Sequence, residues 1–443
     1  MTLDAPLNIA PLLEDDREEE LISILSSLHP ADIAEALSPL DMEDTIKVMS
    51  LLDIQQASDV LVELSESARD HVAQGLPREQ LTKMVAEMDS DDAADIVGDL
   101  DGQTAEEVLS AIDSEDSEDV RRLLMYDEET AGGLMQIELV SAFDTDNVSQ
   151  AIEKIREVRE EIVDLEMIFV IDHNQDYKGV VKLKDLVLAK PDTVIADLIQ
   201  NPGLVVMVDE DQEAVAQKFQ KYDVRAAAVV DNQNRLLGRI TVDDIIDVMH
   251  EETDQDFYRL AGSSEEEIYT SGVLKTAGLR LPWLLFNLGG GLITSFILTR
   301  FEASLLKTVA LVTFVPMVMS LSGAVGSQSA TITVRGLAMG RIGPGQILKS
   351  LFKEQKVTAF MALAFGLTIA LISGTIHGTL RLGLAVGLSI SVAILVSAFL
   401  GAVTPVFFKT INIDPALASG PVVTSTNDVV SLLIYTIIGT SIA

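Results

Sequence analysis

The sequence predicts a multidomain protein in which an acidic soluble half precedes a membrane half. Charge is divided unevenly: residues 1–270 carry 65 acidic and 20 basic side chains, whereas residues 271–443 carry 4 acidic and 11 basic ones. Apolar runs long enough to span a bilayer occur only in the second half. The predicted fold class is therefore an all-α superhelical N domain, an α+β tandem pair, a connecting helix and a five-helix α transmembrane domain.

This distribution excludes several classes of function. The soluble half, with a net charge of −45, would repel phosphate groups, so nucleic-acid binding is not expected. Regular apolar periodicity argues against disorder. The chain has no cysteine, which excludes disulfides and thiolate metal sites. Because the first residues lack a basic segment followed by an apolar core, we expect no cleaved signal and a cytoplasmic soluble half.

Residues 1–130 are expected to form an acidic domain of stacked short helices. The segments A-D-I-A-E-A-L, S-D-V-L-V-E-L and A-D-I-V-G-D-L begin at Ala31, Ser58 and Ala94. Apolar residues recur in them at i, i+3 and i+4, the pattern of amphipathic helices that pack on their neighbours. Most carboxylates are then a solvated face, although such a charge density should expand the domain unless a cation screens it.

Residues 131–258 contain a second repeat, with modules at about 131–196 and 197–258. One copy reads I-F-V-I-D-H-N-Q-D-Y-K-G-V-V-K-L-K-D-L, and the other reads A-A-V-V-D-N-Q-N-R-L-L-G-R-I-T-V-D-D-I, 59 residues later. Each predicts a strand, a polar turn, a second strand and a helix. The pattern resembles a pair of CBS modules, which implies a nucleotide site. Thr241 and Asp244 match its ribose-phosphate corner, although Asp244 equally suits a helix cap.

Residues 246–275 are expected to form a helix that connects the two halves. One face is apolar, and the opposite face is acidic, with Asp247, Glu252 and Asp256 among its residues. A helix in this position would transmit a signal from the soluble half to the membrane half.

Five apolar runs of roughly 20 residues, the length that spans a bilayer, follow Leu281. They cover about 281–299, 309–333, 357–376, 382–407 and 421–442, within an expected domain of 276–443. With the N-terminus inside, eight flanking basic residues lie on the cytoplasmic side and three outside, in agreement with the positive-inside rule. We therefore expect a multi-pass protein of the cell (inner) membrane with an external C-terminus.

Small residues and prolines interrupt these runs. The sequence Gly289-Gly290-Gly291 is equally consistent with close helix packing and with a broken helix. In the second run, Pro316 precedes the polar stretch S-G-A-V-G-S-Q-S. Because broken backbone at membrane depth must face protein or water, this run favours a helix that lines a pore.

Asp428 lies about seven residues inside the last run, in T-S-T-N-D-V-V-S. A carboxylate at that depth costs several kcal/mol unless it faces water, a cation or a basic partner. The basic residues of the membrane half lie at the ends of the runs, so an ion pair is the less favoured interpretation. We favour a cation pathway with oxygens from Thr424, Ser425 and Asn427. Oxygen ligands without His or Cys suit Mg²⁺, Ca²⁺ or Mn²⁺.

Taken together, these features resemble the MgtE family of magnesium channels and transporters over nearly the whole chain. The most specific motif is D-P-A-L-A-S-G-P-V-V-T-S-T-N-D at residues 414–428, which matches the last-span signature of the family. The segment Y-D-E-E-T-A-G-G-L-M at residues 126–135 matches the junction between its N domain and CBS modules. The second span is also similar, except that Ala324 stands where the family has Asn.

The resemblance implies a homodimer with its pore on the twofold axis. Asp428 would hold a hydrated Mg²⁺, because this ion dehydrates reluctantly, and Thr424, Asn427 and Gln328 would be further pore residues. High cytosolic Mg²⁺ would bridge acidic side chains and close the pore, and like-charge repulsion would reopen it when Mg²⁺ falls. The matching regulatory positions are Asp91, Asp95, Asp223, Asp244, Asp247, Glu252 and Asp256. Gln255 replaces a usually acidic residue, which predicts a weaker site.

The leading hypothesis is thus Mg²⁺-selective, Mg²⁺-gated uptake across the plasma membrane, with ATP as a further ligand of the CBS pair. One alternative keeps the architecture and carries Co²⁺ or Mn²⁺, which Ala324 would favour. Another is a non-conducting membrane sensor that uses the CBS pair. An enzyme is not expected, because clustered His, a nucleophile elbow and a Gly-rich phosphate loop are all missing from the sequence.

Overall fold

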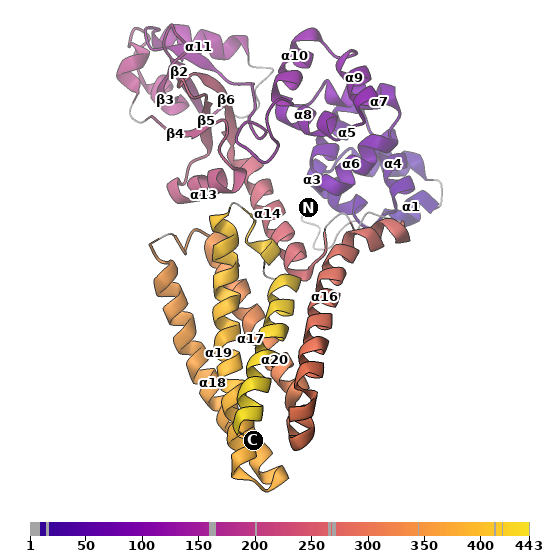
Figure 1. The fold of residues 1–443 in the computed structure, drawn as a ribbon. Helices are drawn as coiled ribbons and strands as arrows, with labels where there is room; N and C mark the ends of the chain where they lie inside the picture. The colour runs from indigo at the N-terminus through magenta and orange to yellow at the C-terminus, as the bar shows by residue number, and fades with distance from the viewer. Residues whose placement is uncertain are drawn as a thin grey trace. The chain divides into compact units, whose positions relative to one another are not determined.

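A computed structural model of the chain divides into two compact units, residues 1–250 and 251–443, which are described separately (Figure 1). It describes residues 9–14, 17–158, 165–199, 202–264, 267, 272–343, 345–411, 413–418 and 420–442. The predicted fold class is confirmed: a helical domain is followed by a pair of α+β modules and by five helices long and apolar enough to cross a membrane.

Short helices build the N-terminal domain. They are α1 (Ala10–Glu14), α2 (Glu18–Leu25), α3 (Pro30–Leu37), α4 (Met42–Leu51), α5 (Ile54–Val62), α6 (Glu66–Gly75), α7 (Arg78–Val85), α8 (Ser90–Gly98), α9 (Gly102–Leu109) and α10 (Ser114–Leu123). The repeated segments lie in α3, α5 and α8, where Ile33, Val60 and Ile96 are fully buried. Asp41 and Asp53 cap the next helix by accepting a bond from its first-turn N–H.

Two three-stranded sheets with the same topology follow. The first contains β1 (Ser141–Phe143), β2 (Met167–Ile171) and β3 (Tyr177–Lys182), and the second contains β4 (Leu204–Met207), β5 (Ala226–Val230) and β6 (Leu236–Thr241). In each, the first pair is parallel and the second antiparallel. Val170 pairs with Gly179, and Val229 pairs with Gly238, and each pair is followed by a bulge. The 59-residue sequence repeat is therefore a structural repeat.

Helices complete each module. The first has α11 (Val148–Glu157), α12 (Leu183–Leu188) and the 3₁₀ helix η1 (Ile195–Leu198), and the second has α13 (Gln212–Tyr222) and the start of α14 (Val242–Ala261). The N domain shares one hydrophobic core with the second module, through residues such as Met135, Val206 and Ile240. Ser90 at the start of α8 joins the two regions, because its Oγ accepts from the N–H of Ile137 (3.0 Å) and donates to Glu138 Oε2 (2.7 Å).

The connecting helix is α14. It begins at Val242 and ends at Ala261, so it is shorter at its C-terminal end than the expected 246–275. Gly262 follows with φ +72°, a left-handed conformation that ends a helix. Residues 265–266 and 268–271 of the expected helix lie outside the described residues.

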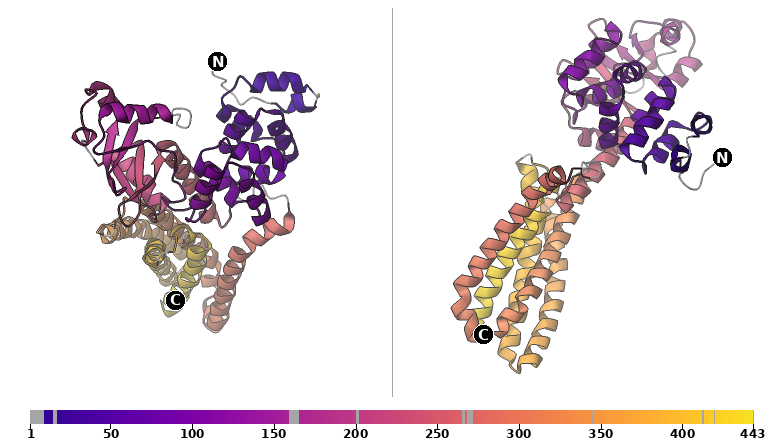
Figure 2. Two further views of the ribbon diagram at one scale, coloured as in Figure 1. Left: turned by 90° about the horizontal axis from the view of Figure 1, so that it is seen from above. Right: turned by 90° about the vertical axis from the view of Figure 1, so that its right-hand side faces the viewer.

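The membrane unit contains α16 (Val273–Leu305), α17 (Ala310–Ala338), α18 (Ile347–His377), α19 (Leu380–Thr410) and α20 (Pro421–Ile442). Two 3₁₀ turns, η2 (Leu306–Thr308) and η3 (Ala416–Ala418), lie between them. The long helices run beside one another (Figures 1 and 2), and each expected apolar run falls on one of them.

Glycines set the distances between these helices. A Cβ built on Gly290 of α16 would lie 2.8 Å from Ser425 Cβ of α20, whereas one on Gly289 or Gly291 would meet nothing within 4 Å. Between α18 and α19, a Cβ on Gly366 would lie 3.0 Å from the carbonyl oxygen of Gly387. Because α16 continues unbroken through its three glycines, this run mediates close packing and does not break the helix.

Candidate cation pathway and acidic regulatory cluster

Asp428 lies in the second turn of α20 and is half-buried. Its Oδ1 is 4.0 Å from the position that a Cβ on Gly323 of α17 would occupy, so the carboxylate lies over a residue without a side chain. Among the residues described, no Lys, Arg or His forms an ion pair with Asp428. The carboxylate is thus positioned by α20 and α17 without a compensating positive charge.

The neighbouring polar residues have different surroundings. Asn427 is fully buried and packs against Gly326, where a Cβ would lie 1.7 Å from its Nδ2. Neither amide atom of Asn427 has a hydrogen-bond partner within the described part of the chain. Thr424 Oγ1 donates to the Gly420 carbonyl (3.1 Å), and Ser425 Oγ donates to Asn287 Oδ1 of α16 (2.6 Å). Among these four residues of α20, only Asp428 has an ionisable side chain.

Helix α17 presents an exposed stripe of small and polar residues. Its members recur at helical spacing and are Ser320, Ala324, Gln328 and Thr331. The opposite side of the helix is buried, with Val318, Val325 and Ala330 among its residues. An exposed Gln is unfavourable against lipid. This stripe therefore suits a water-filled path or a contact with another chain better than lipid.

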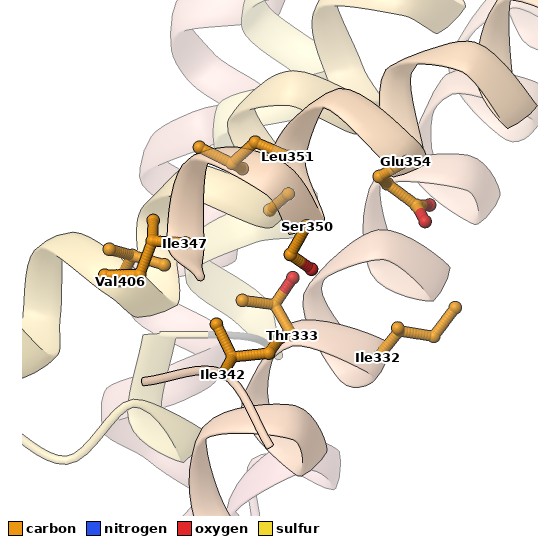
Figure 3. A pocket seen from close by; sticks show the side chains of 9 residues that line it. Ile332, Thr333, Ile342, Ile347, Ser350, Leu351, Glu354 and Val406 are labelled. Atoms are coloured by element: carbon orange, nitrogen blue, oxygen red, sulfur yellow. The ribbon is translucent and has the colours of Figure 1, made fainter. Parts of the chain in front are cut away.

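A separate pocket lies between α17, α18 and α19 (Figure 3). It is lined by Ile332, Thr333, Ile342, Ile347, Ser350, Leu351, Glu354, Ala402 and Val406, none of which is a predicted pore residue. The hydroxyl groups of Ser350 and Thr333 point toward one another in it. Glu354 Oε1 accepts a hydrogen bond from Ser329 Oγ (2.8 Å), so this carboxylate is held between α17 and α18.

In the soluble unit, an acidic cluster forms where α8 faces the start of α14. The predicted residues Asp91 and Asp95 come from α8, and Asp244 and Asp247 come from α14. Arg69 of α6 forms an ion pair with Asp95 (3.4 Å). One carboxylate oxygen of Asp91 is buried without a hydrogen-bond partner among the described residues. The structure thus brings four of the seven predicted regulatory residues into one region.

The electrostatics of the cluster show an excess of negative charge. Burial, together with the nearby charges of Asp244 and Asp95, raises the pKa of Asp92 to about 8, and Arg69 offsets only part of this shift. Burial likewise raises the pKa of Asp244 to about 6. The pKa of Asp91 is raised by burial first and then by Asp92 and Asp244. These carboxylates hold protons unusually tightly because they are buried, first of all, and because other carboxylates lie close to them.

The other three predicted regulatory residues lie elsewhere. Asp223 is exposed and ends α13 in a left-handed conformation, and it is not among the principal charges acting on Asp91, Asp92 or Asp244. Glu252 and Asp256 belong to the membrane unit. Burial raises the pKa of Asp256 to about 6, and Asp414 and Glu252 contribute. A second, smaller acidic group therefore surrounds the end of α14.

A divalent cation fits the chemistry of both groups, since they offer hard oxygens, high negative charge and one orphaned carboxylate oxygen. In the described residues, however, no three Asp, Glu or His side chains converge closely enough to hold an ion as they stand. Binding would require these side chains to move together.

Thr241 and Asp244 have a local structural role. Asp244 Oδ2 accepts from both the N–H (3.0 Å) and the Oγ1 (2.7 Å) of Thr241, which directly precedes α14. These bonds form half of a capping box, so they support the interpretation of Asp244 as a helix-cap residue.

Sequence reasoning missed Asp92, Arg69 and Asp414. Asp92 belongs to the segment D-S-D-D at residues 89–92, and this local concentration of Asp is the sequence feature that could have indicated it. The basic partner Arg69 and the interaction of Arg259 with Asp414 depend on which helices pack together, and no sequence spacing indicates them.

Comparisons with known proteins agree with this architecture. The chain matches the model of a divalent cation transporter, MgtE, over residues 315–438, that of the MgtE intracellular N domain over 28–129, and that of the CBS domain over 131–192 and 195–251. The magnesium transporter MgtE of Enterococcus faecalis is 32% identical over 316 residues, which cover 71% of this chain and 70% of that protein. Those of Bacillus subtilis and Thermus thermophilus are each 31% identical over the same shares.

Among solved structures, the cytosolic domain of the Mg²⁺ channel MgtE in complex with ATP matches with a TM-score of 0.51 and 30% identity, covering 55% of this chain and all of that one. That structure is a cytosolic domain, and the model of the divalent cation transporter covers residues 315–438 of the membrane unit. The chain therefore belongs to the MgtE family.

Proposed function

We propose that the chain is a Mg²⁺-selective channel or transporter that mediates magnesium uptake across the plasma membrane. The observation that carries this is Asp428, a carboxylate within a membrane-spanning helix that has no ion-pair partner in the described residues and lies over Gly323. Such a residue marks an ion pathway. Three relatives are named as magnesium transporters, which supports Mg²⁺ as the transported ion.

The proposed pathway would pass a largely hydrated ion. A single carboxylate without converging ligands cannot replace the water shell of Mg²⁺, whose dehydration is unfavourable. Asp428 would instead accept hydrogen bonds from the inner-shell waters, and the missing side chain at Gly323 leaves room for them. Selection would then depend on the size and charge of the hydrated ion.

A homodimer would complete the path. The exposed stripe on α17 carries Ala324 and Gln328, and Asp428 lies over the same helix. If the stripes of two copies met at a twofold axis, two Asp428 carboxylates would face one water-filled space and Gln328 would be shielded from lipid. In this proposal the N-terminal half would lie in the cytoplasm and the C-terminus outside, which the positive-inside rule supports.

Regulation by cytosolic Mg²⁺ follows from the acidic cluster. When Mg²⁺ is abundant, it would neutralise Asp91, Asp95, Asp244 and Asp247 and draw α8 and α14 together. When it falls, like-charge repulsion would separate them, with Glu252 and Asp256 acting in the same way at the other end of α14. A switch of this kind requires that the ion bind one state more tightly than the other. Asp223 would contribute to Mg²⁺ binding only if the domains of the acidic half were arranged differently.

ATP is a further proposed ligand of the CBS pair. A structure of the cytosolic domain of a related channel was solved with ATP, and Thr241 and Asp244 would form the ribose-phosphate corner of such a site here. Both already bond to one another, so nucleotide binding would have to share or exchange these contacts.

The transported ion can be tested in proteoliposomes. Full-length protein with an internal Mg²⁺ indicator should admit Mg²⁺ in preference to Co²⁺ and Mn²⁺. Entry of Co²⁺ or Mn²⁺ without Mg²⁺ would support the alternative that Ala324 motivates, and no entry of any ion would support the non-conducting sensor. Regulation can be tested separately, because millimolar Mg²⁺ should slow proteolysis of the acidic half. An unchanged rate would contradict bridging.

A further inference from the structure

Helix α18 has an uncovered face with a sharp division of chemistry. At its start, Lys349, Lys353 and Lys356 are exposed and follow one another at i, i+4 and i+7, which places them on one side of the helix. The same side continues through Phe360, Leu363, Leu367 and Leu371, which are 76, 60, 63 and 70% exposed. The exposed side of α18 is therefore basic from Lys349 to Lys356 and apolar from Phe360 onward.

The rest of the helix explains why this face is free. The opposite side, with Ala362, Gly366 and Ile369, is buried, and the contact is made with α19, where Gly366 meets Gly387. Glu354, the only acidic residue of α18, accepts a bond from Ser329 and so is directed to α17. Figure 1 shows α18 at one edge of the membrane unit, beside α19.

The lysines have no ion-pair partner in the part of the chain that the structure describes. Two further basic residues, Arg335 and Arg341, precede α18 and are also exposed. Residues 335–356 thus carry five basic side chains and one carboxylate, Glu354, which already accepts a hydrogen bond. The chain as a whole has a net charge of −38. The positive-inside rule accounts for basic residues at this end of the bundle, but it does not account for their alignment with an exposed apolar stripe.

The dimensions match one leaflet of a bilayer. Phe360 and Leu371 are eleven residues apart, which corresponds to about 16 Å of helix. Half of a hydrocarbon core of about 30 Å is of the same size. An acyl chain lying along the apolar part would carry its headgroup to the three lysines.

We propose that this face, formed by Lys349, Lys353, Lys356, Phe360, Leu363 and Leu367, binds an anionic phospholipid. The lysines would contact the phosphodiester and the additional charge of the headgroup, while the apolar residues contact one acyl chain. Basic residues beside a membrane helix attract anionic lipids, and each lysine near the surface contributes roughly fivefold in affinity.

Native mass spectrometry of the full-length protein tests this directly. The protein would be equilibrated in detergent with equal amounts of phosphatidylglycerol and phosphatidylcholine that carry the same acyl chains. We expect a preference for phosphatidylglycerol that falls about tenfold or more in the K349Q/K353Q/K356Q variant. The K182Q/K184Q/K190Q variant, which removes the same charge from exposed positions of the soluble unit, should keep the preference.

Equal uptake of the two lipids by the unmodified protein, or an unchanged preference in the α18 variant, would overturn the proposal. Faster proteolysis of the acidic half in that variant, with the lipid preference retained, would also overturn it and assign the lysines to the chain's own acidic domain. The melting temperature of the α18 variant in phosphatidylcholine alone checks that it is folded. The F360S variant keeps all charges of the face but loses an apolar contact, so it should also bind less phosphatidylglycerol.

Discussion

Arg259, near the end of α14, donates a hydrogen bond to the carboxylate of Asp414, which precedes the last membrane helix. The same two segments touch again at Gly420, where a Cβ would lie 2.6 Å from the carbonyl oxygen of Leu260. The end of the connecting helix therefore packs against the segment that leads into α20 and to Asp428. Through this contact, a movement of α14 would be transmitted to the proposed pathway.

Weakening this contact should uncouple regulation from transport. Because the pair is partly exposed, its loss is worth up to about 1 kcal/mol, which corresponds to roughly a fivefold shift in a binding equilibrium. In proteoliposomes, R259Q should need severalfold more Mg²⁺ on the cytosolic side for half-inhibition of flux. R300Q removes an exposed charge near the C-terminal end of α16 and should leave inhibition unchanged. The same response in both variants would contradict a specific role for Arg259.

The acidic cluster predicts a dependence on pH. The pKa values of Asp92, about 8, and Asp244, about 6, are raised in the folded protein above their usual range. A raised carboxyl pKa stabilises the folded state at low pH, and this contribution is lost as pH rises through the folded-state value. Without Mg²⁺, the melting temperature of the soluble unit within the full chain should therefore fall between pH 5 and 8.

Mg²⁺ should reverse this loss, because it supplies the missing positive charge where protons have left. Stabilisation by Mg²⁺ is accordingly expected to be larger at pH 8 than at pH 5. D92N cannot form the charge that destabilises the fold at high pH, so without Mg²⁺ it should raise the melting temperature at pH 8 and change it less at pH 5. Equal stabilisation by Mg²⁺ at both values would show that the cluster does not bind it.

The three glycines of α16 offer a matched test of helix packing. G290A would force a Cβ to within 2.8 Å of Ser425, whereas a Cβ at Gly291 meets nothing. We expect G290A to destabilise the membrane unit by about 1–3 kcal/mol. G291A should be neutral or slightly stabilising, since Ala favours a helix by up to about 1 kcal/mol. Thermal unfolding of both variants in detergent is the measurement. If the glycines were needed for a break in the helix, G290A and G291A would both be destabilising.

Ala324 is the residue to change for selectivity. It is exposed on α17, next to Gly323, over which Asp428 lies. An amide at this position would add an oxygen for hydrated Mg²⁺, so A324N should raise the ratio of Mg²⁺ to Mn²⁺ flux severalfold. The smaller change A324G serves as a control and should leave the ratio near that of the unmodified protein. A ratio unchanged in A324N would place the selective contact elsewhere.

Much of the fold can be predicted from the sequence because its signals are local. The five apolar runs, the 59-residue repeat and the helical segments beginning at Ala31, Ser58 and Ala94 each reflect a periodicity of side chains along the chain. The length of α14 could not be predicted, because the left-handed turn at Gly262 interrupts an amphipathic pattern that continues beyond it.

The sites were less accessible to such reasoning. Asp91 and Asp244 come from helices separated by most of the soluble half, and the resemblance to a family identified them before the structure placed them in one region. Arg69, which offsets part of their charge, has no distinguishing neighbours in the sequence. Asn427 and Asp428 are adjacent in the chain but face different surroundings, because successive residues of a helix point about 100° apart. Asn427 packs against Gly326, whereas Asp428 lies over Gly323.

Asp428 is proposed to lie on the path of the ion. Purified D428N and E302Q each remove one of the four carboxylates of the membrane half, and Glu302 is exposed at the end of α16. Mg²⁺ entry into indicator-loaded liposomes should fall to the background of empty liposomes for D428N and remain at the unmodified rate for E302Q. Normal Mg²⁺ entry through correctly folded D428N would show that Asp428 does not lie on the ion pathway.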